Sequence, residues 1–448
     1  MSQADRLLLR SSPSEDTGPE MGLLLGRALA MDCRRVAVAR DLMRSSSMMK
    51  EALVSGLLSA GVDVVDLGVT SGPALAMAAS LGDCAVYVTE YRGYGMISGY
   101  LLVNPDGSLF RREQMRHLER VFVDPPELPG SGNLGHVTRY GDAEEAYRMR
   151  LCQMVPGGCE CTVALDCGCG PASASAPQIL NSMGAGVMAI NAQMDMDYKS
   201  EGMNDMGLDI HGVRNMVESN PGSIGISLNK VGTMMALLDE NGREMGPEAI
   251  VSIVVMNLRP ASIAVPIDTS SLVLDAFHGR FREDGEDADD RELEVVMTER
   301  SAGAVCSAVA AGAEIGYYEG GIIFGRTSMM PDGIQAAAVV SAVAGRVSLS
   351  RLADGLPRYN RDSSERECTC SPEAFVRGIN ESLQEVEGTV VSRGDSWRVD
   401  MKEGWFLISL VRGTSPTVGI VAESEDRAYL VGLMEIADNI VSECMRGQ

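Results

Sequence analysis

The chain has 448 residues, which is more than one hydrophobic core organises, so its length predicts two to four domains. Hydrophobic residues make up 45% of the chain, which argues against extensive disorder, and no apolar run is long enough to span a bilayer. For want of such a run we expect no membrane partner, and the formal net charge of −24 repels phosphate backbones, so we expect no nucleic-acid partner. The first residues lack the basic and then apolar pattern of a signal peptide, which predicts a cytoplasmic protein.

The first unit alternates strands and helices. Its expected elements are strand 35–39, helix 46–60, strand 62–67, helix 73–81 and strand 85–88. Apolar residues of the first helix lie on one face, and Gly61 ends it. This βαβαβ order is typical of a layered α/β domain with a largely parallel sheet.

The same alternation of strands and helices recurs twice along the chain. In the second unit we expect strand 162–165, helix 176–183, strand 187–190, helix 210–218 and strand 223–227. The third unit is expected to contain helix 247–258, strand 261–265, helix 270–277, strand 293–297, helix 302–311 and strand 314–317. Units of about 100 residues are of natural domain size.

The C-terminal part differs from the three units before it. It predicts four short strands at 389–392, 397–401, 405–410 and 418–422, followed by one amphipathic helix at 425–445. Two acidic stretches, 283–292 and 362–367, are interpreted as solvated loops. The predicted fold class is therefore α/β, with three tandem mixed α/β (βαβαβ) domains and a small C-terminal α+β domain.

Eleven cysteines indicate a reducing compartment. Several are separated by one residue only, in the pairs Cys159 and Cys161, Cys167 and Cys169, and Cys368 and Cys370. This spacing is closer than that of paired cysteines in structural zinc sites. Cys161 also begins an apolar strand, where small buried thiols are common. We favour buried thiols over a metal site, and metal binding by these pairs stays open.

Several short segments occur in the order known from one enzyme family. They are residues 49–53 and 55–64, Asn104-Pro105-Asp106-Gly107, Asp166-Cys167-Gly168, Asn191-Ala192-Gln193, Asp239-Glu240-Asn241-Gly242, Gly320-Gly321-Ile322-Ile323-Phe324, Asp332-Gly333, Gly404-Trp405-Phe406-Leu407 and Arg412-Gly413-Thr414. Over nearly its whole length the chain resembles the α-D-phosphohexomutases, which include phosphoglucomutases, phosphomannomutases and phosphoglucosamine mutases.

The resemblance implies four domains around a central cleft, at residues 1–140, 141–243, 244–358 and 359–448. Members of the family move a phosphate between two positions of a hexose through a phosphorylated serine beside a magnesium ion. They are monomers, or dimers through the first domain. Four loops do this work, and each can be compared with the present chain.

The catalytic loop of the family contains the motif T-A-S-H-N-P and reaches N-P-D-G after a fixed interval. Residues 89–107 preserve that interval, but Tyr91 occupies the serine position. A phenol hydroxyl lies several ångströms further from the backbone than a serine hydroxyl, and in-line phosphoryl transfer tolerates little displacement. Tyr91 is therefore expected to be a poor replacement for the nucleophile.

The metal loop of the family contains the motif D-G-D-A-D-R. In the corresponding residues 229–234, the three aspartate positions hold Asn229, Val231 and Thr233. Magnesium prefers carboxylate oxygens, so we expect the family's metal site to be lost and no cofactor to be bound. Lys230 and Arg92 could replace the charge of the metal and hold an anion, or Lys230 could be an ordinary solvated residue.

The two remaining loops concern the sugar and its phosphate. The sugar-selecting loop, residues 317–321, is about two residues short of the family pattern. Glu319 could accept hydrogen bonds from a sugar, and Tyr318 could stack on a sugar or belong to the core. The phosphate-binding loop, residues 409–416, has one inserted residue. Arg412, the Gly413 amide and Thr414 could still cradle a phosphate.

All these losses fall in one chemical site, whereas the helices and strands keep their apolar faces. The pattern favours a pseudoenzyme that has lost mutase activity and binds a sugar phosphate or a protein partner, such as an active mutase paralogue or a second copy of itself. The alternative is a divergent phosphohexomutase of carbohydrate metabolism in which Tyr91 or another residue carries the phosphate. A third interpretation is a structural scaffold with an empty cleft.

Overall fold

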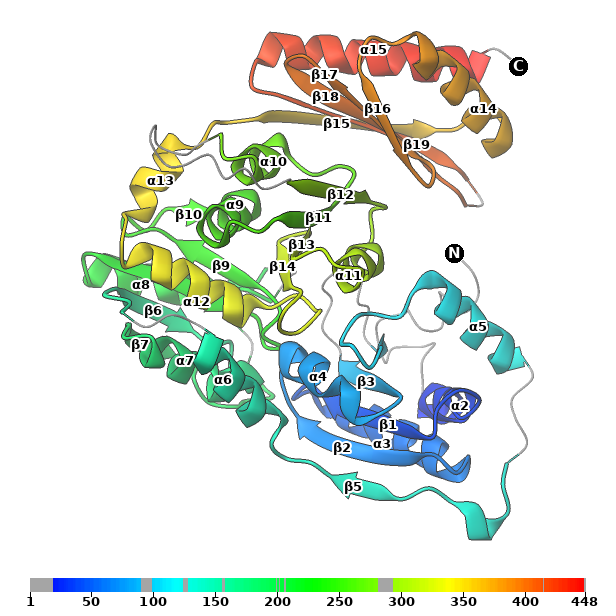
Figure 1. Cartoon of the computed structure of the whole chain (residues 1–448), viewed down its shortest axis with the longest axis vertical. Coiled ribbons are helices and arrows are strands. Elements are labelled where there is room, and N and C mark those ends of the chain that lie inside the picture. Colours follow the sequence, from blue (N-terminus) through cyan, green and yellow to red (C-terminus); the bar gives the residue numbers. More distant parts are fainter. Residues whose placement is uncertain are drawn as a thin grey trace.

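A computed structural model gives the structure of the chain and describes residues 19–89, 99–123, 128–154, 158–198, 200, 202–204, 207–280, 293–413 and 415–446. Four β-sheets follow one another along these residues, and each is formed by strands that are consecutive in the chain (Figure 1). The first three sheets combine parallel and antiparallel pairs, and the fourth is antiparallel throughout. The predicted fold class is thereby confirmed.

The first unit is a five-stranded sheet in the order β4-β3-β1-β2-β5. Its elements are α2 (Pro19–Leu29), β1 (Arg35–Arg40), α3 (Arg44–Ser59), β2 (Asp63–Val69), α4 (Gly72–Ala78), β3 (Cys84–Thr89), β4 (Gly99–Val103), α5 (Arg112–Val123) and β5 (Val137–Arg139). Side chains of β1 alternate between the two faces: Val36 and Val38 pack with α2 and α3, whereas Ala37 and Ala39 pack on the side of α4. Both faces are covered, which explains the continuous apolar run.

The second unit is a five-stranded sheet in the order β10-β9-β8-β6-β7. Its elements are α6 (Ala143–Met154), β6 (Thr162–Asp166), α7 (Ala176–Ser182), β7 (Gly186–Ile190), α8 (His211–Ser219), β8 (Ser223–Leu228), β9 (Met235–Leu238) and β10 (Glu244–Met245). Ala164 of β6 packs with Val213 and Val217 of α8, whereas Val163 and Leu165 belong to a large core on the other face. The three parallel strands are those predicted.

The third unit is a four-stranded sheet in the order β12-β11-β13-β14. Its elements are α9 (Pro247–Leu258), β11 (Ser262–Pro266), α10 (Ser271–Phe277), β12 (Glu294–Thr298), α11 (Ala302–Ala310), β13 (Ile315–Tyr318), β14 (Gly321–Phe324), α12 (Gly333–Ala344) and α13 (Leu349–Gly355). The core that contains Leu165 of the second unit continues into Val265 of β11 and Val340 of α12. The second and third units therefore share one apolar core.

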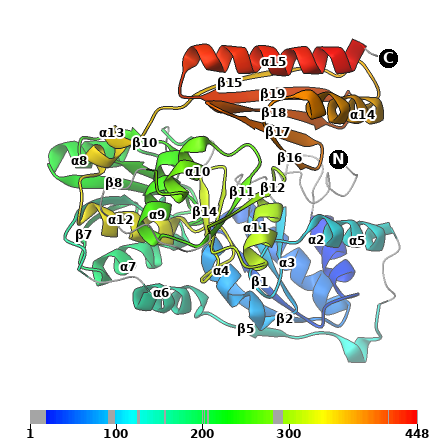
Figure 2. The same cartoon turned by 45° about the horizontal axis from the view of Figure 1, so that its top comes forward.

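The fourth unit is an antiparallel sheet with both of its helices on one face (Figures 1 and 2). Its elements are β15 (Asn360–Glu367), α14 (Pro372–Ser382), β16 (Thr389–Arg393), β17 (Ser396–Met401), β18 (Gly404–Val411), β19 (Thr417–Ser424) and α15 (Arg427–Arg446). Phe406 and Ile408 face α14 and α15, whereas Trp405 and Leu407 pack against Ile267 of the third unit. The sheet thus separates the covering helices from the rest of the chain.

One prediction for this unit is wrong. Residues 362–367, interpreted as a solvated loop, belong to β15, which pairs with β19 from Asn360 to Glu367. The strand lies at the edge of the sheet, and most of its side chains are exposed. Charged residues on an edge strand prevent unwanted pairing with other chains, so its polar sequence does not require a loop. The other acidic stretch, 283–292, lies outside the described residues.

Helix α6 holds the first three units together. Glu144 accepts hydrogen bonds from the Thr70 and Ser71 hydroxyls of the first unit at 2.8 and 2.9 Å and from the Ser175 hydroxyl of the second unit at 2.6 Å. One turn later, Tyr147 donates a hydrogen bond of 2.7 Å to Asp332 of the third unit. Tyr147 and Asp332 are fully buried.

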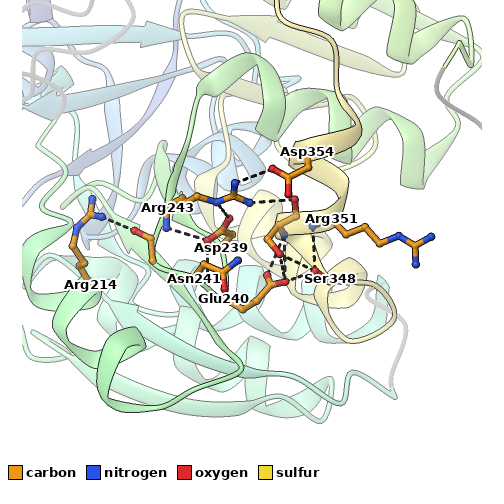
Figure 3. Close-up of polar contacts among 10 residues, drawn as sticks. Arg214, Asp239, Glu240, Asn241, Arg243, Ser348, Arg351 and Asp354 are labelled. Atoms are coloured by element: carbon orange, nitrogen blue, oxygen red, sulfur yellow. Dashed lines mark hydrogen bonds and ion pairs between the residues drawn. The ribbon is translucent and has the colours of Figure 1, made fainter.

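A polar clamp joins the β9–β10 turn of the second unit to α13 of the third (Figure 3). The Arg243 guanidinium donates to Asp239 at 2.7 Å and to Asp354 of α13 at 2.8 Å. Glu240 accepts a hydrogen bond from Ser348, the N-cap residue of α13. These bonds fix the position of a short helix that buries little apolar surface itself.

Among the described residues, no single helix is both long and apolar enough to cross a bilayer. Helices α12 and α13 reach that length and composition only when taken together, and they are bent by 93° relative to each other.

Candidate functional site

The carboxyl ends of parallel strands are the usual place for ligands in α/β sheets. In the second unit, Asp166 ends β6, Asn191 follows β7 and Asn229 follows β8. The Asp166 carboxylate accepts hydrogen bonds from the Gly168 amide at 2.7 Å and from the Asn191 side chain at 3.0 Å. Burial raises the pKa of Asp166, although these two hydrogen bonds oppose the rise. The polar groups at this edge of the sheet are therefore hydrogen-bonded to one another.

The loop of residues 229–234 is closed on itself. The Asn229 side chain accepts a hydrogen bond from the Thr233 amide at 2.9 Å and donates one to the Thr233 hydroxyl at 3.0 Å. Asn229 is 0% exposed, and Val231 and Thr233 are each 2% exposed. The side-chain amide thus holds the loop shut.

The donor set of this loop does not fit a magnesium ion. Mg²⁺ requires near-octahedral oxygen ligands and usually carboxylates, whereas the loop offers one amide, one aliphatic side chain and one hydroxyl. The amide and the hydroxyl of Asn229 and Thr233 already bond to each other. Within the described ranges, no group of three His, Cys, Asp or Glu residues could hold a metal ion.

Neighbouring domains enclose the same loop. The Gly72 amide at the start of α4 donates to the Val231 carbonyl at 2.9 Å, and the Gly333 amide at the start of α12 donates to the Gly232 carbonyl at 3.0 Å. A Cβ on Gly72 would lie 2.8 Å from the Thr233 methyl group. The loop therefore lies at a junction of three domains and leaves little room for an added ion.

Lys230 extends from this loop toward Tyr198. Its ammonium donates to the Tyr198 carbonyl oxygen at 2.7 Å and lies 5.7 Å from the centre of the Tyr198 ring. The Tyr198 hydroxyl in turn accepts a hydrogen bond from Asn191 at 2.9 Å. Tyr198 is a contact of this cation that the sequence motifs did not single out, because Tyr198 lies 32 residues before its partner.

In the first unit, the corresponding edge anchors the base of the catalytic loop. The Thr89 hydroxyl at the end of β3 donates to Asp41 after β1 at 2.8 Å, and Asp41 also accepts the Met43 amide at 2.9 Å. Tyr91, which occupies the serine position of the family and is expected to replace it poorly, and Arg92, the possible anion ligand, lie outside the described residues.

The sugar-selecting loop is a minimal hairpin turn. Tyr318 pairs with Gly321 across β13 and β14, so only Glu319 and Gly320 form the turn, with φ angles of 44° and 86°. Glu319 is exposed, Tyr317 is buried and Tyr318 is partly buried. Burial raises the pKa of Tyr318, and a hydrogen bond to Glu319 adds to the rise.

Three charged residues near this turn were not predicted from the sequence. Arg300 after β12 donates to Asp268 after β11 at 2.8 Å, and Arg361 of the fourth unit lies 3.7 Å from the same carboxylate. The signal that could have found Asp268 is its place directly after a buried parallel strand.

The predicted phosphate-binding residue Arg412 follows β18. Its guanidinium donates to both Asp395 carboxylate oxygens, at 2.6 and 3.2 Å, and to Glu373 at 2.9 Å. The hydrogen bond to Asp395 is the main reason that the pKa of Arg412 is raised. Gly413 is exposed, and Thr414 lies outside the described residues.

The cysteines that are close in sequence are free thiols. The sulfur atoms of Cys159 and Cys161 are 3.2 Å apart, and those of Cys368 and Cys370 are 3.8 Å apart. Burial raises the pKa of the Cys161 thiol to about 12, so this pair is poorly suited to act as a thiolate at neutral pH.

Comparisons with known proteins agree on one family. Residues 13–126 match the model of phosphoglucomutase/phosphomannomutase, alpha/beta/alpha domain I. Two proteins described as probable phosphoglucosamine mutases are similar over 98% of this chain and 98% of their own length: one from Methanococcoides burtonii is 29% identical, and one from Methanosarcina barkeri is 28% identical. A solved phosphoglucomutase/phosphomannomutase family protein from Burkholderia thailandensis shares the fold, with a TM-score of 0.79, 19% identity and coverage of 100% of this chain and 99% of that chain.

Proposed function

The chain belongs to the α-D-phosphohexomutase family, and from this premise we propose that it has lost the family's magnesium-dependent mutase reaction and keeps the four-domain body to bind a sugar phosphate or a protein partner. The proposed loss concerns the reaction and not the fold, because the described residues form all four sheets and the apolar cores between them.

The observation that carries this proposal is the closed loop 229–234. Phosphoryl transfer depends on neutralising the charge of the transferred group, which a metal ion does in this family. At the corresponding positions, Asn229 and Thr233 bond to each other and Val231 is packed among apolar side chains. An ion would have to break the Asn229 contacts and would gain no carboxylate in return.

A role in binding an anion is compatible with the fourth unit. Arg412 is 47% exposed at its side chain, and both of its carboxylate partners are surface residues. A phosphate that binds Arg412 must therefore compete with the carboxylates of Asp395 and Glu373 for the guanidinium. The bidentate guanidinium geometry suits a phosphate as well as a carboxylate.

A coupled assay with glucose, mannose and glucosamine phosphates in the presence of Mg²⁺ tests the proposal. We expect no turnover above the background without protein, no effect of chelator on thermal stability, and no phosphoserine by mass spectrometry. Turnover that requires Mg²⁺ would overturn the proposal.

Binding is tested separately by thermal shift against the same sugar phosphates, since a ligand of the folded state raises the melting temperature. An Arg412→Leu variant should lose any such rise, whereas Arg446→Leu in the last turn of α15 should keep it. A rise that is equal in both variants would remove Arg412 from the site.

The second candidate function is a divergent phosphohexomutase. The similarity to probable phosphoglucosamine mutases over 98% of both chains favours it, since no domain has been lost. In that case Tyr91 or a neighbouring residue carries the phosphate, and Tyr91→Phe abolishes a turnover that the unmodified chain shows. Turnover that is independent of Mg²⁺ and lost in Tyr91→Phe would favour this candidate over the first.

A further inference from the structure

Strand β15 forms one edge of the fourth sheet, beside α15 (Figure 2). It pairs with β19 from Asn360 to Glu367, and among the described residues no strand pairs with its other side. Proline, lysine and a β-bulge, three devices that commonly protect an edge strand, do not occur in it. Its charged side chains remain as protection, and they determine which further strand can pair with this edge.

The backbone bonds of β15 show which of its residues face outward. The Cys368 amide, directly after the strand, donates to the opposite Pro416 carbonyl at 2.8 Å. Because hydrogen-bonded pairs alternate along an antiparallel ladder, the even-numbered residues of β15 bond to β19, and the odd-numbered ones direct their amides and carbonyls away from it. In agreement, the Ser363 amide donates to the Asp362 carboxylate at 2.8 Å. A partner strand must therefore pair with the odd-numbered residues.

The charges of β15 are complementary to those of an antiparallel second copy in one register. When the Ser364 residues of both copies lie on a two-fold axis, Arg361 is opposite Glu367 of the second copy, and Asp362 is opposite its Arg366. The symmetry repeats both pairs. In this register the odd-numbered residues oppose one another, so their backbone groups can bond. Cross-strand pairs of opposite charge stabilise a sheet, and this register places no like charges directly opposite each other.

Neighbouring registers are less favourable. The register centred on the middle of the strand places Arg361 opposite Arg366 and sets outward-facing residues against inward-facing ones. An axis at Ser363 retains only the pairing of Arg361 with Glu365 and its symmetry mate. An axis at Glu365 sets the Glu365 carboxylates of the two copies against each other. The charges therefore select one register and disfavour the others.

We propose that two copies of this chain associate through β15 in this register, which joins their fourth sheets into one continuous antiparallel sheet. The contact is small, so we expect a dissociation constant in the micromolar range. Strand β15 contains no residue of the four loops that the family uses for its chemistry. The inference therefore does not rest on the proposed loss of mutase activity, and the two are tested by different measurements.

A groove of about 440 Å³ beside Ser364 adds surface to this contact. Val431 and Met434 of α15 line the groove, and Val431 is 53% exposed. Because Ser364 lies on the two-fold axis, the grooves of the two copies face each other, so that these apolar side chains lose contact with water. Glu435 and Asp438 also line the groove and repel their counterparts in the second copy, which limits the affinity.

Two charge reversals test the register by sedimentation equilibrium of the full chain over the micromolar concentration range. Glu367→Arg sets arginine against Arg361, and Arg361→Glu sets glutamate against Glu367, so each variant alone should dimerise about tenfold more weakly or worse. An equal mixture of the two variants places opposite charges at both positions again, and it should form a heterodimer about as readily as the unmodified chain dimerises. An unmodified chain that remains monomeric throughout this range would overturn the proposal, and so would a mixture that does not recover association.

A backbone substitution separates strand pairing from charge. The Glu365 amide faces away from β19, so Glu365→Pro removes a donor that the second copy alone would use, and proline is tolerated at such a position of an edge strand. This variant should keep its melting temperature and dimerise about tenfold more weakly or worse. Glu365→Gln is the matched control: it keeps the amide and should dimerise normally, because Glu365 is opposite the uncharged Ser363. A dimer that Glu365→Pro and Glu367→Arg both leave intact forms through another surface, such as the first domain, and would overturn the proposal.

Discussion

Asp332 is a fully buried carboxyl group where α6 of the second unit meets α12 of the third. Burial raises its pKa from 3.8 to about 7, and the Gln335 amide and the Tyr147 hydroxyl only partly oppose this rise. The folded chain therefore keeps the Asp332 proton to higher pH than the unfolded chain does. The stabilisation that this proton provides is complete below about pH 4 and is lost as the pH rises to about 7.

Asp332→Asn removes this titration and keeps the oxygen that accepts from Tyr147 and Gln335. Between about pH 4 and pH 7, the free energy of unfolding of the unmodified chain should fall relative to that of the variant by a few kcal/mol. Urea denaturation at several pH values measures the difference. If it is constant across that window, Asp332 does not titrate as its burial indicates.

Val231 tests whether the closed loop can be reopened toward a metal site. Val231 is 2% exposed and belongs to an apolar cluster, so Val231→Asp buries a carboxylate there. We expect this substitution to lower the free energy of unfolding by about 3 kcal/mol or more. Val231→Asn introduces a side chain with the shape of aspartate but without its charge. It should lower the free energy of unfolding by less than Val231→Asp does. Millimolar Mg²⁺ should leave the melting temperature of both variants unchanged. Stabilisation of Val231→Asp alone by Mg²⁺ would contradict our account of the loop.

The sequence predicts part of this site and not the rest. The neutral residues at 229, 231 and 233 are visible in it, and their poor fit to Mg²⁺ follows from chemistry. That neighbouring domains enclose the loop depends on hydrogen bonds from Gly72 and Gly333, which lie more than 90 residues away in either direction. Likewise, nothing local in the sequence indicates that Arg412 bonds to Glu373 as well as to Asp395.

The turn between β13 and β14 can be tested by substitutions of Glu319. Glu319 and Gly320 both have positive φ angles, as a two-residue type I′ turn requires, and asparagine is far better suited than glutamate to the first position. Glu319→Asn should therefore stabilise the chain by about 0.5–1 kcal/mol, and Glu319→Val should destabilise it by about 1 kcal/mol or more. Thermal unfolding compares the two, and a reversed order would show that the turn has another geometry.

The elements that were predicted are those marked by apolar runs or by clear start and stop residues, whereas the helices α5, α12 and α14 were not expected despite their amphipathic or apolar patterns. Strand β11 and helix α9 were expected within one residue of their observed ends, because apolar runs and a leading proline mark them. Strand β15 was mistaken for a loop because an exposed edge strand needs no apolar side chains. Helix α13 was not predicted, since the bonds that hold it come from Arg243 and Glu240 of another domain (Figure 3).

For the whole molecule, the junctions between units differ in kind. Large apolar clusters cross from the first unit to the third and from the second to the third. The apolar cluster between the third and fourth units is smaller and contains Ile267, Trp405 and Leu407. Beside it, Arg398 donates to the Ile267 and Thr269 carbonyls at 3.1 and 2.7 Å. The attachment of the fourth unit therefore depends more on polar bonds than the other junctions do.

Arg398 is the residue on which this attachment most depends. Its side chain is 1% exposed, lies 4.1 Å from the centre of the Trp405 ring and pairs with Asp400 at 2.8 Å. Burial lowers the pKa of Arg398, but the group remains a cation with several donors in one plane. A lysine has one ammonium and cannot reproduce the two carbonyl bonds, the carboxylate bond and the ring contact together.

Arg398→Lys should therefore weaken the junction by about 2–3 kcal/mol, because buried carbonyl groups lose their donors. We expect faster proteolysis in the segment 356–359 that links the third and fourth units, and a larger radius of gyration by X-ray scattering. Arg361→Lys is the matched control: this arginine also lies over Trp405, at 5.5 Å, but its side chain is 38% exposed and its contact with Asp268 is 3.7 Å long. Arg361→Lys should weaken the junction between the third and fourth units by less than about 1 kcal/mol. Equal effects of the two substitutions would mean that the apolar contacts of Trp405, and not the bonds of Arg398, hold the fourth unit in place.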